Sequence, residues 1–291
     1  MLSPSTAASL FSPMINSHTL DFAEQQSAVV RLALEAAKRG GEVLLQFWNR
    51  LSSSEVREKG RGDLVTQADI ESEKAISDFL KKETPEWSII AEEGTEVTTG
   101  NTIWFVDPLD GTTNFVQGFP IFAVSLGLAE RLPDGNYDLQ VGVVVNPISG
   151  DVFWGAKGRG SYFGTTRLRV SVKEKLADAV IGTGFPRRYS DELSGYLKEF
   201  GALYPRCRAI RRAGAASLDL CWTAQGIFDA FWEHRLAPWD IAAGSLIVME
   251  AGGICSDFSG KSNILQSGNI LGASPSLHRQ ILGIIGPLQS G

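Results

Sequence analysis

The segment Trp104–Phe115 constrains the fold of this chain most, because an apolar run is followed directly by two acids, a turn and paired hydroxyls. Residues 102–106 are β-branched and aromatic, which favours a strand buried on both faces of an open α/β sheet. Pro108 lacks a backbone N–H and restricts Asp107 to extended geometry, so we expect the strand to end at Asp107. The Asp107 side chain then lies at an edge of the sheet where catalytic groups commonly collect.

The turn after this strand has the composition of a metal site. Asp107 and Asp110 flank a short Pro-Leu turn, and Gly111 lets the chain reverse without a Cβ in the way. Two nearby carboxylates repel, so either one is protonated or a hard cation such as Mg²⁺ lies between them, with the Leu109 carbonyl as a further ligand. A helix beginning at Thr112–Asn114 would point N–H groups at an anion, and metal plus anion suggests phosphate. The simpler alternative is an Asx turn in which both aspartates bind backbone donors.

Composition is that of a globular protein from a reducing compartment. The 291 residues suffice for one large core or two fused lobes without disulfides. Cys207, Cys221 and Cys255 form no C-x-x-C pair, so each is expected to act as a small buried hydrophobic residue. The formal charge of −6 argues against a protein built mainly to coat nucleic acid or an anionic membrane. Without a membrane-spanning run or a secretory signal, the expected location is the cytoplasm.

Hydrophobic periodicity divides the chain into a tail and two lobes. Residues 1–20 are expected to form a flexible tail, and 21–291 one domain with an N-terminal lobe of about 21–168 and a C-terminal lobe of about 169–291. The expected helices are 23–48, with a weak point at Gly40–Gly41, then 69–82, 191–203, 215–225, 241–251 and 276–285. The expected strands are 87–91, 102–106, 121–129, 139–145, 151–156, 179–182 and 227–232. This order predicts stacked layers of helix and sheet around more than one core.

Acids at the ends of other elements are candidates for the same site. Glu92 follows an expected strand and could meet Asp107 if the two strands are neighbours. Asp240 lies just before or at a helix start, and so does Asp69, where the ordinary interpretation of each is a helix cap. Lys59, upstream of Asp69, is a cation that could bias nearby waters or acids.

Three of these segments, taken in order, closely resemble the motifs of the inositol monophosphatase family of lithium-inhibitable, metal-dependent phosphatases. They are Ser88–Gly94, ending in Glu-Glu-Gly; Asp107–Phe115, Asp-Pro-Leu-Asp-Gly-Thr-Thr-Asn-Phe; and Trp239–Gly244, Trp-Asp-Ile-Ala-Ala-Gly. The resemblance covers about Ala23–Leu288 and also runs through Gly62–Asp69, Arg211–Leu220, Gly252–Gly253 and Ser267–Gly272. It implies a five-layer αβαβα sandwich, hydrolysis of a phosphate monoester with two to three Mg²⁺ ions, and usually a homodimer.

The resemblance also implies roles for individual residues. The family's metal ligands are matched by Glu92, Asp107, Asp110, Asp240 and the Leu109 carbonyl. Asp69 matches a residue that helps hold a further Mg²⁺ through water, and Lys59 matches the lysine beside it. Gly111 and Thr112 match the loop that holds the phosphate, while Glu233, Gly214 and Ala215 match the pocket that binds a sugar or inositol hydroxyl.

The implied mechanism uses water as the nucleophile, with its pKa lowered by the cations. Thr112 together with Asp69 would orient this water and accept its proton, with Lys59 as the third catalytic candidate. The cations would neutralise charge on the phosphoryl oxygens and the departing alkoxide, so no covalent phosphoenzyme is required.

Several functions remain open within and beyond this reaction. Myo-inositol monophosphate is the expected substrate, and fructose 1,6-bisphosphate, histidinol phosphate and nucleotide 3′-phosphates are its rivals. A second phosphate could be reached by the arginines 187, 188, 206, 208, 211 and 212, although most such runs are solvated faces. A non-catalytic metal-binding protein that works through a partner is the alternative from another class. Scattered histidines at 18, 234 and 278 and the lack of a P-loop or a Gly-x-Ser-x-Gly elbow exclude histidine-metal, ATPase and serine-hydrolase sites.

Overall fold

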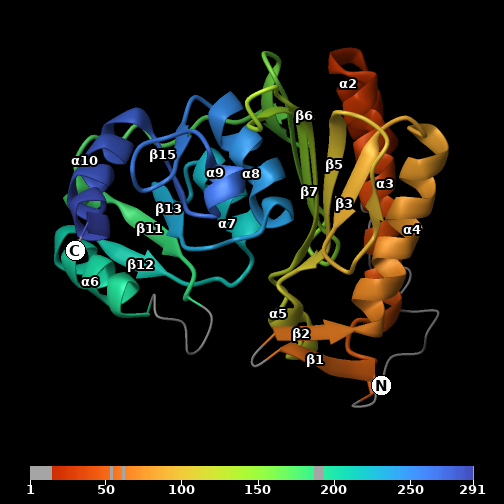
Figure 1. The fold of residues 1–291 in the computed structure, drawn as a ribbon, viewed down its shortest axis with the longest axis horizontal. Helices are drawn as coiled ribbons and strands as arrows, with labels where there is room; N and C mark the ends of the chain where they lie inside the picture. The colour runs from red at the N-terminus through yellow and green to blue at the C-terminus, as the bar shows by residue number, and fades with distance from the viewer. Residues whose placement is uncertain (1–14, 53–54, 61–62, 187–192, 291) are drawn as a thin grey trace.

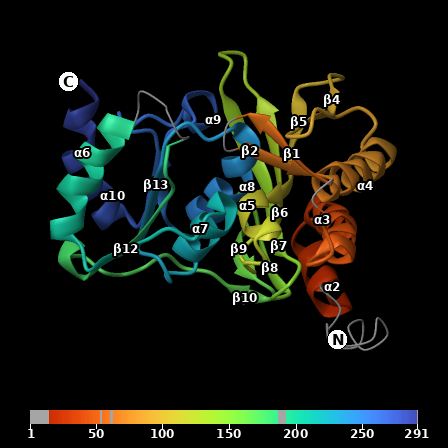
Figure 2. The ribbon, with the colours of Figure 1, turned by 90° about the horizontal axis from the view of Figure 1, so that it is seen from below.

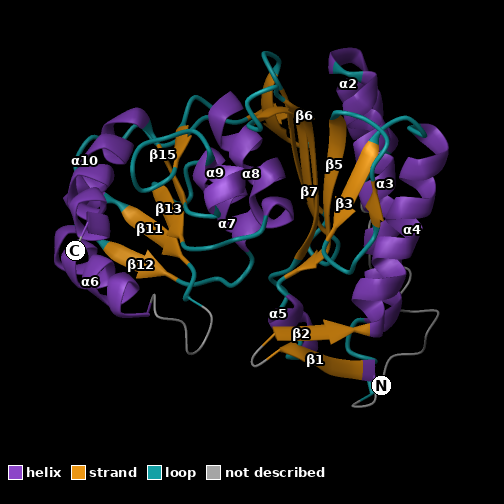
Figure 3. Ribbon diagram, viewed as in Figure 1, coloured by secondary structure: helices purple, strands orange, loops and turns teal. Residues whose placement is uncertain are grey.

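Five layers in the order αβαβα make up the structure, as the family resemblance implies (Figure 1 and Figure 3). The structure is a computed structural model that describes residues 15–52, 55–60, 63–186 and 193–290. An eight-stranded sheet and a five-stranded sheet alternate with three layers of helices. No helix within these ranges is long and apolar enough to cross a membrane.

The first layer contains α2 (Ser17–Gln26), α3 (Ala28–Phe47) and α4 (Gln67–Glu83). The helix predicted at 23–48 is therefore two helices, because Ser27 is extended with φ −166°. The helix α2 begins inside the segment expected to be a tail, of which residues 1–14 lie outside the described ranges. The predicted weak point at Gly40 is instead a contact, since a Cβ there would lie 2.6 Å from Ile76 Cδ1 of α4.

The eight-stranded sheet has the order β10-β9-β8-β7-β6-β5-β3-β4 and contains every strand predicted before residue 160. Its strands are β3 (Ser88–Ala91), β4 (Glu96–Val97), β5 (Thr102–Asp110), β6 (Ala123–Arg131), β7 (Tyr137–Asn146), β8 (Asp151–Ala156), β9 (Gly160–Phe163) and β10 (Thr166–Arg167). The strands β3 and β5 are parallel neighbours with Ala91 opposite Val106, so the acids that follow them reach the same edge.

The prediction that the strand ends at Asp107 is wrong. The strand β5 continues to Asp110, which pairs with Ala123 of β6 after an irregularity between Asp107 and Asp110. One extra residue on β5 forms a bulge there, and Pro108 falls where the ladder is interrupted, so its missing N–H breaks no bond.

A row of glycines brings the middle helical layer close to this sheet. Gly127, Gly142 and Gly155 lie opposite one another on β6, β7 and β8. A Cβ at Gly127 would be 2.5 Å from Ala242 Cβ, and one at Gly142 would be 2.5 Å from Ala243 O. These alanines belong to α8 (Pro238–Glu250), which lies beside α7 (Ala216–Ala224). The helix α8 therefore packs directly onto strand backbone.

The second sheet and an outer pair of helices complete the layers. Its order is β12-β11-β13-β15-β14, with β11 (Val180–Thr183), β12 (Ala209–Arg211), β13 (Ala230–Glu233), β14 (Ile254–Ser256) and β15 (Ile270–Ala273). The helices α6 (Leu193–Leu203) and α10 (Pro275–Ile285) lie on its outer face, as Figure 2 shows from a second direction. Predictions missed β12, β14, β15, α9 (Ile264–Ser267) and the hairpin of β1 (Val56–Gly60) with β2 (Asp63–Thr66), because each is too short to show a period.

Candidate active site

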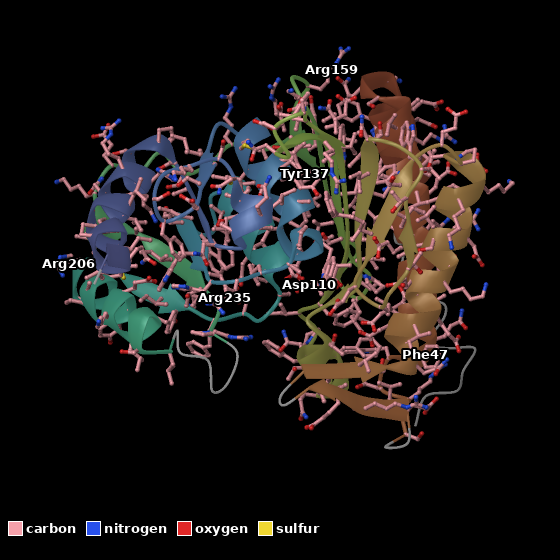
Figure 4. The ribbon with its side chains drawn as sticks, in the orientation of Figure 1. Phe47, Asp110, Tyr137, Arg159, Arg206 and Arg235 are labelled. Atoms are coloured by element: carbon pink, nitrogen blue, oxygen red, sulfur yellow. The ribbon has the colours of Figure 1, made fainter. Side chains whose placement is uncertain are left out.

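A cavity of about 170 Å³ contains most of the predicted site residues. Its lining includes Glu92, Asp107, Leu109, Asp110 and Asp240, the expected metal ligands, together with Gly111, Thr112 and Gly214, and also Leu64, Thr113 and Arg212. Figure 4 shows Asp110 at the lower end of the junction between the eight-stranded sheet and the helices α7 and α8. The site is therefore built from both lobes.

Asp107 is buried among other acids at the end of β5. Its Oδ1 accepts the Leu109 N–H at 2.9 Å, so the Asx turn considered from the sequence does form. Burial raises the pKa of Asp107 well above its usual range, and the charges of Glu92, Asp110 and Asp240 raise it further. Burial and the charges of Glu92 and Asp110 likewise raise the pKa of Asp240. Such a cluster is stabilised by added positive charge, as protons or as a cation.

Two of the acids stand in the first turns of helices and accept backbone hydrogen bonds there. Asp69 Oδ2 accepts from the Thr66 N–H at 2.8 Å and from the Thr66 hydroxyl at 2.6 Å at the start of α4. Asp240 Oδ2 accepts from the Ala237 N–H at 2.7 Å at the start of α8. Each aspartate is the third residue of its helix and accepts the backbone N–H of the N-cap residue, Thr66 or Ala237, so neither aspartate is itself the N-cap. This bond fixes each carboxylate beside the cavity.

Thr112 connects Asp69 to the cavity. The Thr112 hydroxyl lies 3.0 Å from Asp69 Oδ1 and 3.1 Å from the Leu109 carbonyl oxygen. Asp69 is fully buried, and burial raises its pKa while the hydrogen bonds from Thr66 and Thr112 lower it. A buried carboxylate next to a hydroxyl at the cavity wall has the arrangement of a proton acceptor.

Asp110 is held by the second lobe. Its Oδ2 accepts the backbone N–H of Ser217 at 2.8 Å and also the Ser217 hydroxyl. Burial raises the pKa of Asp110, whereas these donors, the Ala216 N–H and the charge of Arg212 lower it. Asp110 thus differs from Asp107, because hydrogen-bond donors surround Asp110 whereas acids surround Asp107.

Two glycines bring the turn after β5 against the second lobe. Gly111 has φ +91°, and a Cβ there would lie 3.2 Å from the Gly214 carbonyl oxygen, so both the backbone and the space require glycine. The helix α5 (Thr112–Val116) begins directly after it, as predicted. Asn114 Nδ2 of this helix donates to Ile121 O at 2.7 Å and to Ala213 O at 3.0 Å, which ties the turn to both lobes.

The remaining predicted residues lie around this cavity or outside the described part. Glu233 ends β13 and lies against Gly184, where a Cβ would come within 1.9 Å of Glu233 Cδ. Burial and the Asp110 charge raise the pKa of Glu233 to about 8, against the lowering effect of Arg212. Ala215 is buried next to Gly111. The Lys59 side chain and the predicted arginines at 187 and 188 lie outside the described residues.

The basic cluster predicted at 206–212 is divided in the structure. Arg206 donates to the Ala202 carbonyl at 2.6 Å on the outer edge of the second lobe, far from Asp110 (Figure 4). Arg208 pairs with Asp178 at 2.9 Å, and Arg211 donates to its neighbour Ile210. Arg212 lines the cavity.

Sequence reasoning missed two residues that the structure places at the site. Ser217 and Thr66 donate to Asp110 and Asp69, and neither was assigned a role. A capping-box pattern, Thr66 followed by Asp69 three residues later, is a signal that could have found Thr66. The contact of Ser217 spans 107 residues and leaves no local signal.

The donor set fits a hard cation by its chemistry. Carboxylate and carbonyl oxygens are the ligands that Mg²⁺ prefers. The raised pKa values of Asp107 and Asp240 come from burial and from neighbouring negative charge, which a bound cation would offset. In the ranges described, no three His, Cys, Asp or Glu side chains are already gathered as the ligands of one ion. The cation is therefore proposed below from the donors and not from a formed coordination shell.

Comparison with known proteins assigns the family. The model of the inositol monophosphatase family matches residues 25–289. The chain is 41% identical over 265 residues to a Nus factor SuhB of Pseudomonas aeruginosa, covering 89% of this chain and 96% of that protein. It is 40% identical over 253 residues to an inositol-1-monophosphatase of Caulobacter vibrioides, with 86% and 97% covered.

A solved structure agrees with these relatives. The extragenic suppressor protein suhB of Bartonella henselae is 37% identical and superposes with a TM-score of 0.84 over 89% of this chain and 98% of that one. Fold, acid-lined cavity and sequence thus agree, and the chain belongs to the inositol monophosphatase family.

Proposed function

We propose that this protein hydrolyses a phosphate monoester of a polyol, myo-inositol monophosphate, with Mg²⁺ as cofactor and water as nucleophile. The observation that carries the proposal is the cavity in which Glu92, Asp107, Asp110 and Asp240 converge. The raised pKa values of Asp107 and Asp240 indicate carboxylates that need positive charge beside them. The family and the inositol-1-monophosphatase of Caulobacter vibrioides support the reaction type.

The four carboxylates and the Leu109 carbonyl would hold two to three Mg²⁺ ions. Bound Mg²⁺ supplies Lewis acidity toward phosphoryl oxygens and lowers the pKa of water. The helix-cap bonds to Asp240 and the serine bonds to Asp110 fix the side chains in place before any ligand binds. Such prior ordering reduces the conformational entropy lost on binding.

Thr112 and Asp69 provide a path for the proton of the attacking water. The Thr112 hydroxyl donates to Asp69 Oδ1, which leaves the Thr112 oxygen lone pairs directed elsewhere as acceptors. A water hydrogen-bonded to Thr112 Oγ1 would pass its proton to that atom while the threonine proton moves to Asp69. Because burial raises the pKa of Asp69, the acid is better able to accept this proton.

Substrate recognition is proposed for the surrounding loop and the end of β13. Gly111 and Thr112 would receive the phosphate, and Gly214 and Ala215 would line the wall opposite. Burial raises the pKa of Glu233 to about 8, and its two oxygens can accept from neighbouring hydroxyls or, when the acid is protonated, donate to one of them. Two vicinal hydroxyls of inositol suit this pair of oxygens.

The cavity and basic residues bear on the rival substrates. Arg212 lines the cavity, whereas Arg206, Arg208 and Arg211 point elsewhere, which weakens the case for a second phosphate. The name of the Pseudomonas aeruginosa relative favours one second candidate, a function as a Nus factor that works through a partner. A variant that folds but is catalytically inactive, such as Asp110→Asn, separates the two functions.

A phosphate-release assay tests the proposal directly. Purified protein is offered inositol monophosphate, fructose 1,6-bisphosphate, histidinol phosphate and adenosine 3′,5′-bisphosphate, each with Mg²⁺ and with EDTA. We expect Mg²⁺-dependent release that is fastest from inositol monophosphate and is lost in Asp110→Asn with the fold intact. Near-normal turnover by that variant would reject the site, and release that does not need metal would reject the mechanism.

Three further properties are proposed from the family. They are a homodimeric state, inhibition by Li⁺ and a cytoplasmic location. Light scattering of the purified protein, a Li⁺ titration of the assay above and cell fractionation test them separately.

A further inference from the structure

The hydrogen bonds between Ser217 and Asp110 join the two halves of the cavity. Ser217 is fully buried and is the second residue of α7, while Asp110 ends β5 in the other lobe. The Ser217 N–H lies 2.8 Å from Asp110 Oδ2, and the Ser217 hydroxyl donates to the same oxygen. One residue therefore supplies two donors to one carboxylate oxygen.

The two donors differ in what they require from the sequence. The N–H belongs to the first turn of α7, where backbone N–H groups have no partner within the helix, so any residue at 217 would offer it. The hydroxyl is present because residue 217 is serine. Substitution by alanine removes the hydroxyl and keeps the N–H, which separates the two contributions.

The bonds from Ser217 also determine how Asp110 faces the cavity. Both end on Oδ2, the Ala216 N–H is a further donor to the same carboxylate, and a carboxylate held by these donors loses rotation about its Cβ–Cγ bond. Hydrogen-bond partners of ligating carboxylates orient them, and losing such a partner typically weakens metal binding about 10-fold or more.

We propose that Ser217 is a positioning residue that holds Asp110 in the orientation in which it binds the cation. This inference rests on the proposed function for the identity of the cation. A role confined to joining the lobes predicts a different result, because stability would fall while the affinity for the cation stayed the same.

Binding of Mg²⁺ alone, without substrate, tests the inference. The dissociation constant is measured by calorimetry and by the shift of Tm with Mg²⁺ concentration for wild type, Ser217→Ala and Thr223→Val. Thr223 is the matched control, since it is buried in the same helix. Its hydroxyl donates to the Asp219 backbone carbonyl oxygen at 2.8 Å, within the helix. We expect the dissociation constant to rise about 10-fold in Ser217→Ala and by less than about twofold in Thr223→Val.

A second comparison links the effect to Asp110. In an Asp110→Asn background, Ser217→Ala should change the Mg²⁺ dissociation constant by less than about twofold, because the oriented carboxylate is already gone. Equal Mg²⁺ affinity in Ser217→Ala and wild type would overturn the inference, and so would a wild-type protein that binds no Mg²⁺. Wild-type protein that binds Mg²⁺ but releases no phosphate would reject the proposed function, while a retained 10-fold difference would still support the role of Ser217.

Discussion

The second lobe buries a carboxylate among donors, whereas the cavity buries carboxylates among one another. Glu199 of α6 is 1% exposed. Its Oε2 lies 3.1 Å from Trp232 Nε1 and 2.8 Å from His234 Nε2, and its Oε1 accepts from Gln289 Nε2 at 2.7 Å. Both oxygens of Glu199 are therefore satisfied by the fold itself.

Asp107 is equally buried but has neighbours of the opposite kind. It is 1% exposed and accepts one backbone N–H from Leu109, and its other polar neighbours are acids: Glu92, with which it shares a side-chain hydrogen bond, Asp110 and Asp240. A buried charge without a partner is far more expensive than a buried charge that is fully hydrogen-bonded. The contrast teaches that exposure alone does not identify a site, and that the partners of a buried acid do.

The largest effect should come from Asp107→Asn, which removes the charge and keeps the shape. We expect kcat/KM for inositol monophosphate to fall about 10³-fold, since a proposed metal ligand is lost, whereas the metal-free protein keeps or raises its Tm because repulsion is relieved. Phosphate release and thermal unfolding in EDTA measure the two effects.

Asp178→Asn is the control for this variant, because Asp178 is half exposed and pairs with Arg208 away from the cavity lining. It should change neither quantity noticeably. An Asp107→Asn protein that keeps more than a tenth of wild-type activity would show that Asp107, like Glu199, serves the fold and not the reaction.

Glu199→Ala should give the reverse pattern. The Trp232 and His234 side chains would be left buried without this acceptor, so the free energy of unfolding should fall by about 3 kcal/mol. Native protein below its Tm should retain the wild-type kcat. Denaturant unfolding measures the free energy of unfolding, and phosphate release measures kcat. Glu199→Gln keeps one acceptor oxygen and should therefore lose less stability than Glu199→Ala. A lower kcat with an unchanged free energy of unfolding would show that Glu199 serves activity and not stability.

Glu233 lies between Glu199 and the acids of the cavity: it precedes His234, which contacts Glu199, and it is close to the cavity. Replacement by Gln should lower kcat/KM for inositol monophosphate about 10-fold and for an aryl phosphate less than about twofold, because only the polyol offers hydroxyls to it. With a pKa of about 8, wild-type Glu233 loses its proton between pH 7 and 9, so the preference for the polyol should change there in wild type only. Equal losses for both substrates would remove the specificity role.

Asp219 is a third kind of buried acid, and its replacement should have the smallest effect on activity. Its Oδ1 has no hydrogen-bond partner among the described residues, and burial, followed by the charges of Glu233 and Asp110, raises its pKa well above the usual range. The unfolded chain releases this proton near pH 4 while the folded protein keeps it, so stability falls as pH rises above that point.

Asp219→Asn should therefore be more stable than wild type, by a margin that grows with pH at up to about 1.4 kcal/mol per unit until the native acid ionises. Unfolding in urea at pH 5, 6 and 7 measures this margin. A stability difference that is the same at all three pH values would show that unfolding does not change the ionisation of Asp219.

The sequence predicted that these acids lie close together, because their placement follows from local rules. Strands end in acids before Gly or Pro, and the parallel pairing of β3 with β5 brings Glu92 and Asp107 to one edge. The end of β5 was wrong because a bulge at Pro108 depends on its partner β6. Ser217 was missed because its partner is 107 residues away, and the strand β15 because four residues show no period.

Residues without any functional group decide where one of the acids stands. Gly127 and Gly142 let α8 rest on the backbone of the sheet, and Asp240 is in the first turn of that helix. A methyl group at Gly142 would lie 2.5 Å from the Ala243 carbonyl oxygen, so α8 would have to rise and carry Asp240 with it. A related chain that keeps every acid but has a side chain in this row would be expected to lack activity. Surveys that select active members of the family by their acidic motifs should therefore inspect these glycines as well.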